Sequence, residues 1–265
     1  MPKTKRRDLS SLIEKYSKYS VVEEIEKNLA SFPHSEVKTS SLLLHPLFEK
    51  DNYDLSLYTS LKDSLSHDGF LSPLVLVPAK EKGKYYVING VKRYLLGKTI
   101  PLASMPGVIA DLSQERQRVY ILENILAEND CPLVKTTCFS RLIKENSFSP
   151  EDIALITKLS LSQVRNLIRL EELPPFLKEG LRHNTLTYSQ ARALLSLDEE
   201  SQKEIYQKIL SSSISVREIE SYKRRVRGKA KKRKVTLHKK SVTITFHSAE
   251  EAKKAYPNIL KSFSD

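Results

Sequence analysis

The stretch "EDIALITKLSLSQVRNLIRL", residues 151–170, carries two groups of apolar residues at helical spacing whose phases do not match. A small residue at Ala154, a left-handed turn position at Lys158 and an apolar residue at Val164 have the spacing of a helix-turn-helix. The remaining core positions would be filled by Ile153, Leu159 and Leu167. Lysine in place of the usual glycine at the turn costs about 1 kcal/mol of backbone strain. The change of phase is then the turn between two crossing helices.

The outward positions of the second helix are polar, as a DNA-recognition helix requires. They are Ser160, Ser162, Gln163, Arg165, Asn166 and Arg169. Such side chains read base edges and hold phosphates. We expect Arg169, near the helix end, to hold a phosphate, and Gln163 and Asn166 to read bases. The alternative, an ordinary helical hairpin with a polar surface, is not excluded by spacing alone.

The charge of the chain favours an acidic partner. The net charge is +12, which indicates nucleic acid or an anionic membrane surface. Residues 223–240, "KRRVRGKAKKRKVTLHKK", hold eleven Lys or Arg and no acid. Neutralising phosphates releases condensed counterions, so we expect DNA contacts in this run. The candidates are Lys231, Lys232, Arg233 and Lys234. The alternative is a solvated linker.

Apolar runs and cysteines point to a cytoplasmic protein. No apolar run approaches the roughly 18 residues that a membrane helix needs. Cys131 and Cys138 lie seven residues apart, too far along a helix to bridge. We therefore expect reduced thiols and no membrane partner.

The order of patterns predicts an α+β multidomain chain. Strands are expected at "PLVLVPA" (73–79), "KYYVING" (84–90) and "PGVIADL" (106–112), and a helix in 55–69 would place Leu57, Leu61 and Leu65 on one face and stop at Gly69. Strands alternating with helices indicate a small α/β domain. Residues 132–227 show helices without strands. Period-two strands at 235–246, followed by a helix, form a β-β-α unit with too little core to stand alone, which predicts dimerisation.

The predicted parts divide the chain into five segments. We expect an N-terminal mobile segment, a small α/β nucleotide-binding domain, an all-α helix-turn-helix domain, a basic linker and a small C-terminal dimerisation domain. Their boundaries are 1–36, 37–130, 131–227, 228–234 and 235–265.

Several boxes in this order resemble the ParB family of chromosome and plasmid partition proteins. They are "HPLFEK" (45–50), "INGVKRYLLGK" (88–98), "LENILAENDCP" (122–132) and the stretch from the helix-turn-helix to "TYSQARALLSL" (187–197). The resemblance implies a homodimer that binds a palindromic parS-type DNA site, closes as a clamp when it binds CTP, and hydrolyses CTP slowly to CDP and phosphate. It also implies a cytoplasmic location at the nucleoid, and it adds Arg192 to the expected DNA-binding residues.

The resemblance assigns roles in a nucleotide pocket. Gly90, Lys92, Arg93 and Asn124 would hold CTP, Glu123 and Asn124 would bind Mg²⁺, and Glu123 would serve catalysis. The family pattern is eroded elsewhere in these boxes. The departures are Phe48, Lys50, Val91, Leu95, Leu126 and Ala127. The alternative is therefore a pocket that no longer binds nucleotide and acts as a folded spacer.

The N-terminal stretch "KTKRRDLSSLIEKY" resembles the peptide with which the family stimulates a ParA-type ATPase. The expected contacts are Lys5, Arg6, Arg7, Leu9 and Leu12. The alternative is a disordered basic tail.

We predict a site-specific DNA-binding partition protein. One alternative is a ParB-like transcriptional regulator or nucleoid-associated protein without a partition role. Another is an enzyme, because some nucleases and sulfiredoxin share the N-terminal fold. The redox chemistry of that fold needs a cysteine in the phosphate-binding box, and "INGVKRY" has none.

Overall fold

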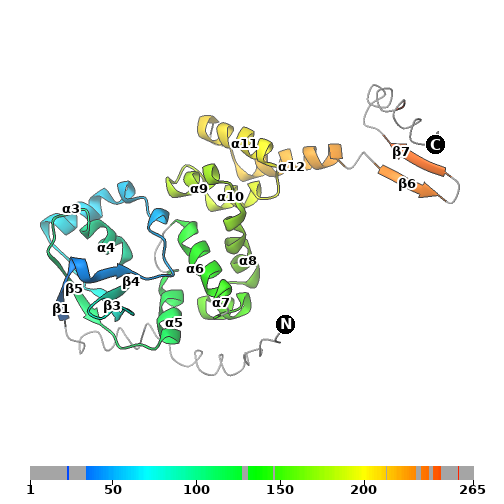
Figure 1. The fold of residues 1–265 in the computed structure, drawn as a ribbon. Coiled ribbons are helices and arrows are strands. Elements are labelled where there is room, and N and C mark those ends of the chain that lie inside the picture. The colour runs from blue at the N-terminus through cyan, green and yellow to red at the C-terminus, as the bar shows by residue number, and fades with distance from the viewer. Residues whose placement is uncertain are drawn as a thin grey trace. The chain divides into compact units, whose positions relative to one another are not determined.

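The structure is a computed structural model that describes residues 34–126, 131–145, 147–212 and 214–230, strands 234–238 and 241–245, and the single residues Glu23 and Tyr256 (Figure 1). Two compact units divide between Leu195 and Ser196. None of the helices in these residues is long and apolar enough to cross a membrane.

A five-stranded mixed sheet forms the α/β part of the first unit. Its strands, in spatial order, are β1 (His34–Lys38), β5 (Ser104–Ile109), β3 (Leu74–Pro78), β4 (Tyr85–Asn89) and β2 (Leu42–Leu44). The outer pair β1–β5 and the hairpin β3–β4 are antiparallel, while β3–β5 and β2–β4 are parallel. The central strand β3 is buried from Leu74 to Val77, which explains its unbroken apolar run.

The structure confirms the three predicted strands and adds two that were not predicted. Strands β3, β4 and β5 match the predicted ranges, and β3 and β4 are joined by a turn at Gly83, whose φ is 79°. Strand β1 begins inside the segment that the sequence sets apart as 1–36. Its only buried residue is Val37, so its place comes from pairing with β5 at the sheet edge rather than from an apolar pattern.

Helices and 3-10 turns surround the sheet. They are η1 (Thr39–Ser41), η2 (Lys50–Asn52), η3 (Leu55–Tyr58), α3 (Thr59–His67), α4 (Val91–Gly97) and α5 (Gln114–Asn124). The predicted helix in 55–69 starts as a 3-10 turn, whose three residues per turn shift its phase. Leu57, on the 3-10 turn, is 45% exposed, whereas Leu65, on α3, is 4% exposed.

The rest of the first unit is helical, as the sequence predicts. Its elements are α6 (Pro132–Lys144), α7 (Pro150–Thr157), α8 (Leu161–Arg169), η4 (Leu170–Glu172), α9 (Pro175–Arg182) and α10 (Tyr188–Leu194). Ser149 and Thr187 each begin a helix with a capping box, closed by Asp152 and Gln190 respectively. Both cysteines are free thiols, Cys131 at the start of α6 and Cys138 within it.

Helix α6 connects the two halves of the first unit (Figure 1). Its inner side buries Leu133, Val134, Phe139 and Leu142. Thr136 Oγ1 donates a hydrogen bond to the carbonyl oxygen of Leu167 at 2.8 Å, which attaches α6 to α8. A helix buried along its length fixes the position of the elements that it contacts, so α6 positions the segments on both of its sides.

The second unit contains α11 (Glu199–Ser212), α12 (Val216–Ala230), β6 (Lys234–His238) and β7 (Ser241–Thr245). Strands β6 and β7 pair antiparallel, with Val235 opposite Ile244. The predicted strands are thus confirmed. The helix predicted to follow them lies outside the described residues, apart from Tyr256, which is helical and exposed.

Candidate nucleotide pocket and helix-turn-helix

The turn between α7 and α8 has the geometry that the sequence predicts. Lys158 adopts the left-handed conformation, with φ 57° and ψ 19°. Ile153, Val164 and Leu167 are buried between the helices. Two crossing helices joined by a left-handed residue form the helix-turn-helix motif, so this prediction is confirmed.

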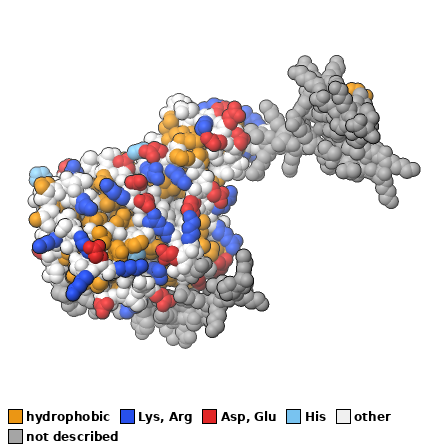
Figure 2. Space-filling model, viewed as in Figure 1, with side chains coloured by type: hydrophobic (Ala, Val, Ile, Leu, Met, Phe, Trp, Pro, Cys, Tyr) orange, Lys and Arg blue, Asp and Glu red, His pale blue; other side chains and the backbone are white. Residues whose placement is uncertain are grey.

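The predicted recognition face of α8 lies at the surface (Figure 2 shows one face of the molecule by side-chain type). Ser160, Ser162, Gln163, Arg165 and Arg169 are exposed, and Asn166 is half-buried. Ser160 also begins the helix: its backbone N–H and hydroxyl donate to Gln163 Oε1 at 2.8 and 2.9 Å. A base contact from Gln163 would therefore use its amide nitrogen or require this cap to open.

The arginines of the predicted DNA-binding surface form weak ion pairs. Arg165 lies 3.2 Å from Glu151, and Arg169 lies 3.9 Å from Glu172, with all four side chains largely exposed. Exposed pairs contribute only about 0–1 kcal/mol. Exchange of the carboxylate for a DNA phosphate would thus cost little. Arg192 is exposed on α10.

Several predicted residues are not described by the structure. Lys231, Lys232 and Arg233 lie outside the described residues, and Lys234 is the first residue of β6. The expected partner-binding residues also lie outside, namely Lys5, Arg6, Arg7, Leu9 and Leu12. These assignments stay predictions.

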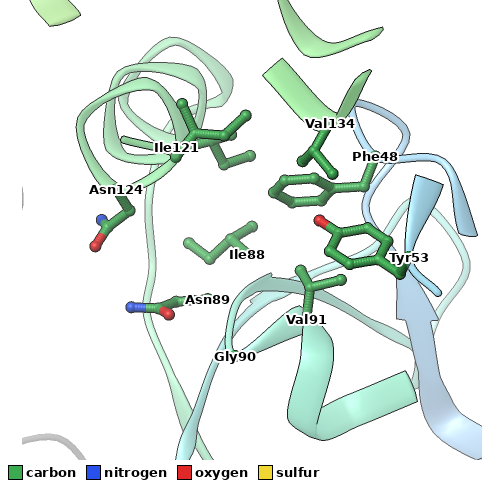
Figure 3. Close-up of a pocket in the computed structure, with 10 residues that line it drawn as sticks. Phe48, Tyr53, Ile88, Asn89, Gly90, Val91, Ile121, Asn124 and Val134 are labelled. Atoms are coloured by element: carbon green, nitrogen blue, oxygen red, sulfur yellow. The ribbon is translucent and has the colours of Figure 1, made fainter. Parts of the chain in front are cut away.

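A shallow pocket of about 300 Å³, including the open solvent at its mouth, lies where β4 turns into α4 (Figure 3). Its lining is Phe48, Tyr53, Ile88, Asn89, Gly90, Val91, Ile121, Asn124, Ile125 and Val134. Mostly apolar walls with a few polar groups are typical of small-molecule sites. Of the predicted nucleotide residues, Gly90 and Asn124 line this pocket, whereas Lys92, Arg93 and Glu123 do not.

Gly90 is required by the backbone at this turn. Its φ is 82°, and a Cβ atom there would lie 2.8 Å from Leu74 Cδ2 and 2.9 Å from Arg93 Nη2. Only glycine combines this left-handed conformation with so close an approach. The glycine therefore lets Leu74 and Arg93 pack directly against the backbone of the turn that lines the pocket.

The two cations of the box are engaged next to the pocket. Arg93 Nη1 donates to the carbonyl oxygen of Ser72, to Ser72 Oγ at 2.8 Å and to the carbonyl oxygen of Pro73 at 3.4 Å. The Lys92 ammonium lies 5.4 Å from the centre of the Tyr58 ring. Arg93 thus fixes the loop before β3 through Nη1.

The polar side of the pocket is built around Tyr120. Asn124 Nδ2 donates to the Tyr120 carbonyl oxygen at 3.0 Å, and Asn89 Nδ2 donates to the Tyr120 hydroxyl at 3.1 Å. These bonds use the amide nitrogens, so the amide oxygens remain as ligands. Figure 3 shows both amides on the same side of the pocket. Sequence reasoning missed Asn89, although it directly precedes Gly90.

The donor set suits a metal only when a nucleotide supplies further ligands. Within the described residues, no group of three or more His, Cys, Asp or Glu side chains could hold a metal ion. Mg²⁺ commonly takes one or two protein ligands together with substrate phosphates and water. Of the two predicted metal ligands, Asn124 lines the pocket and its amide oxygen fits such a partial role, whereas Glu123, its neighbour on α5, is not part of the lining.

The apolar wall of the pocket is positioned by two neighbours of Phe48. His45 Nδ1 accepts the backbone N–H of Leu47 at 3.2 Å, and burial lowers the pKa of this imidazole to about 4. Arg141 Nη1, from α6, donates to the carbonyl oxygens of Pro46 and Phe48, both at 2.6 Å. The neutral imidazole of His45 and the guanidinium of Arg141, which is far away in the sequence, therefore stabilise the turn that places Phe48 in the pocket.

Two domain families match the chain in succession. The family described as the ParB N-terminal domain matches residues 23–125, and the ParB HTH domain matches residues 128–228. The match to the N-terminal family covers the sheet and the Gly90 pocket. The match to the second family covers the helix-turn-helix.

Named relatives agree with these matches. The probable chromosome-partitioning protein ParB of Helicobacter pylori is 30% identical over 165 residues, which are 62% of this chain and 56% of that protein. Stage 0 sporulation protein J of Bacillus subtilis is 27% identical over 187 residues, 70% of this chain and 66% of that protein. The chain thus matches less than two thirds of the length of either relative.

A solved structure is also similar. It is that of the C-terminally truncated chromosome-partitioning protein ParB from Caulobacter crescentus complexed to the centromeric parS site. The identity is 23%, the likeness covers 72% of this chain and 99% of that chain, and the TM-score is 0.44. A score below 0.5 does not establish how the parts of this chain are arranged. Because both domain families match in succession over most of its length, the chain belongs to the ParB family.

Proposed function

We propose that this protein binds a palindromic, parS-type DNA site as a homodimer and acts in the segregation of a bacterial chromosome or plasmid. The observation that carries the proposal is the helix-turn-helix at Lys158, with its exposed polar face on α8. Net charge +12 supports binding to a polyanion. Membership of the ParB family supplies the class of DNA site.

The dimer would form through the C-terminal segment. Strands β6 and β7 form a two-stranded sheet, and an isolated two-stranded hairpin is only marginally stable in water. Pairing with a second copy about a twofold axis would cover the face of Val235 and Ile244. A twofold dimer in turn matches a palindromic DNA site.

The Gly90 pocket would bind CTP with Mg²⁺ and gate a DNA clamp. The bare backbone at Gly90 allows a phosphate to approach closely, and the amide oxygen of Asn124 is a ligand for the metal-bound triphosphate. Glu123 would position water or the metal for slow hydrolysis to CDP and phosphate. Since the family's orienting arginines are partly replaced, we expect weaker binding than in a complete pocket and a larger loss of hydrolysis, which depends on positioning.

The role of the N-terminal segment and the location of the protein in the cell are proposed from the same family membership. The basic N-terminal segment would engage a ParA-type ATPase through Lys5, Arg6 and Arg7. The protein would lie in the cytoplasm at the nucleoid. The segment boundaries predicted from the sequence belong to the same proposal.

DNA recognition is tested by selecting bound duplexes from a random pool and then measuring affinities by fluorescence anisotropy. We expect the selected site to be a palindrome. Asn166→Ala should reduce the preference for that site over random DNA by roughly 5- to 150-fold, the equivalent of one base contact of about 1–3 kcal/mol. Gln163→Ala should act similarly. Because Gln163 also closes the capping box of α8, the helix content of this variant is measured to show its effect on the cap separately.

The matched control is Gln207→Ala, an exposed glutamine on α11. It should leave the preference unchanged. If Asn166→Ala and Gln163→Ala both keep full discrimination, α8 is not the recognition helix and the proposal fails.

Nucleotide binding is tested by calorimetric titration of CTP, with ATP and GTP as controls, in the presence of Mg²⁺ and the selected DNA. Asn124→Ser should weaken CTP binding, whereas Glu123→Gln should lower turnover and spare binding. The absence of heat at millimolar CTP would remove the clamp from the proposal and leave DNA recognition in place.

A further inference from the structure

A second cavity lies between the α/β part of the first unit and its helices. It has a volume of about 750 Å³, including solvent at its mouth, and is mainly polar. Its lining is Glu49, Asn52, Leu133, Thr136, Thr137, Ser140, Arg141, Lys144, Glu171, Lys178 and Arg182. None of these residues lines the Gly90 pocket, so the two cavities are separate.

The charge of this cavity is unbalanced. Four cationic side chains, Arg141, Lys144, Lys178 and Arg182, face two carboxylates, Glu49 and Glu171. Arg141 pairs with Glu49, and Lys144 Nζ lies 2.5 Å from Glu171 Oε1. These pairs neutralise two of the four cations and leave the charges of the other two.

The remaining two cations are only partly compensated. Lys178 Nζ donates at 2.8 Å to the backbone carbonyl of Glu171, which carries no net charge. Arg182 Nη1 lies 3.0 Å from Glu179, a carboxylate that also bonds His183. Within the described residues, Lys178 is therefore the one cation of the lining whose charge no ion pair balances, and it lies on α9 (Pro175–Arg182) together with Arg182.

Two buried polar atoms on the cavity lining have no hydrogen-bond partner. Among the described residues, Ser140 Oγ and Arg182 Nε are the buried side-chain atoms in this state. The Lys144 ammonium, and then the Ser140 hydroxyl, favour ionised Glu171 and lower its pKa, but Ser140 Oγ does not reach hydrogen-bond geometry. An unmet buried donor costs roughly 1–3 kcal/mol, and most such groups in proteins have a partner.

An oxyanion would offset the excess charge, and rotation of the Ser140 and Arg182 side chains toward the cavity would bring their two unmet donors to it. A hydroxyl, a guanidinium N–H and an ammonium are all donors, and together they suit a ligand that is acceptor-only and multiply charged. Water would fill the hydrogen bonds but would not offset the excess charge. We propose that this cavity binds a terminal phosphate group through Ser140, Lys178 and Arg182.

Two kinds of ligand carry a phosphate group that this cavity could bind. A phosphate monoester or pyrophosphate carries a terminal, multiply charged group, whereas a DNA backbone phosphate carries one charge and two ester links. The experiment therefore compares inorganic pyrophosphate with a random-sequence duplex, each added to the full-length protein.

The first measurement is lysine footprinting on the unmodified protein. An amine-reactive acylating reagent is applied with and without millimolar pyrophosphate, and modification is read by mass spectrometry. We expect protection at Lys178 and Lys144 but not at Lys92, beside the Gly90 pocket, or at Lys203, an exposed lysine on α11. Protection confined to Lys92 would assign the anion to the nucleotide pocket and overturn the inference.

The second measurement is calorimetric titration of pyrophosphate into the wild type and two variants. Lys178→Gln combined with Arg182→Gln should weaken binding by roughly 100-fold or more, since two hydrogen bonds to a charged ligand are lost. Lys203→Gln should bind as the wild type does. Equal binding by all three proteins, or no heat with the wild type, would refute the phosphate site.

The duplex arm decides the source of the phosphate. Protection of Lys178 by pyrophosphate, but not by the duplex, supports a free phosphate compound. Protection by the duplex alone would assign the cavity to the DNA backbone and overturn the terminal-phosphate assignment. A variant that fails to fold does not affect the footprint, because that measurement uses the wild-type chain. Neither measurement depends on CTP binding at Gly90, so the two ideas can fail separately.

Discussion

Replacing Gly90 with alanine should destabilise the first unit by about 2–5 kcal/mol. The left-handed conformation, with φ 82°, costs an alanine roughly 1–2 kcal/mol. The added Cβ would also lie 2.8 Å from Leu74 Cδ2 and 2.9 Å from Arg93 Nη2. Overpacking of this kind typically costs a further 1–3 kcal/mol, roughly. Leu74 lies in the buried central strand, so it cannot give way as cheaply as the end of the Arg93 side chain.

Gly83→Ala is the matched control for this prediction. Gly83 has φ 79°, and a Cβ there would meet no atom within 4 Å. It should therefore lose only the backbone part, roughly 1–2 kcal/mol. The assay is urea unfolding of both variants and the wild type, followed by circular dichroism and fitted with a common m-value.

The difference between the two alanine variants isolates the steric contribution. We expect Gly90→Ala to be less stable than Gly83→Ala by about 1–3 kcal/mol. Equal stabilities would show that the pocket floor accommodates a methyl group, and the reasoning on close packing at Gly90 would be wrong. If the prediction holds, loss of CTP binding in Gly90→Ala is to be interpreted only after its stability is known.

Four further predictions concern the turn, a buried histidine, the basic run and assembly. Lys158→Gly should stabilise the protein by about 0.5–1 kcal/mol in urea unfolding, because glycine adopts φ 57° without strain; a less stable variant would contradict this. Burial lowers the pKa of His45 from 6.5 to about 4. As the pH falls, this histidine therefore binds a proton in the unfolded chain before it does so in the folded protein. The free energy of unfolding should fall by about 3 kcal/mol between pH 6.5 and 4. His45→Asn should flatten that part of the pH profile, and an unchanged profile would exclude His45 as its cause. Neutralising residues 231–234 should lower the salt slope of non-specific DNA binding by roughly 0.9 for each DNA phosphate that the protein no longer neutralises; the same slope in both proteins would make the run a solvated linker. Truncation after Arg227 should give a monomer in sedimentation equilibrium, and a truncated dimer would place the interface elsewhere.

The sequence by itself determined the local features of this protein. The left-handed turn at Lys158 was predicted, and the structure has it; the helix starts at Ser149 and Thr187 are local in the same way. Their hydrogen bonds join residues three or four apart, so residue type and spacing suffice to specify them. The buried strands β3, β4 and β5 were readable for a similar reason, because a continuous or alternating apolar run reports burial directly.

Only the tertiary structure decided which residues share a pocket. Val134 of α6 meets Phe48 and Gly90 there, although they are far apart in the chain. Arg93, which the family pattern assigns to the nucleotide, also donates through Nη1 to Ser72 and Pro73. A guanidinium has several donors and accepts whichever oxygens the fold brings near, so its partner cannot be read from its own segment.

Strand β1 and the polar cavity likewise could not be predicted from the sequence. Strand β1 has little apolar pattern and exists through its pairing with β5, which lies far along the chain. The cavity lined by Ser140, Lys178 and Arg182 depends on how α6 and α9 pack against the segment around Glu49. Short-range hydrogen bonds and apolar periodicity are specified by residues that are close together in the sequence. Contacts between distant segments are chosen by packing of the whole unit, and they decided the shape and charge of both cavities.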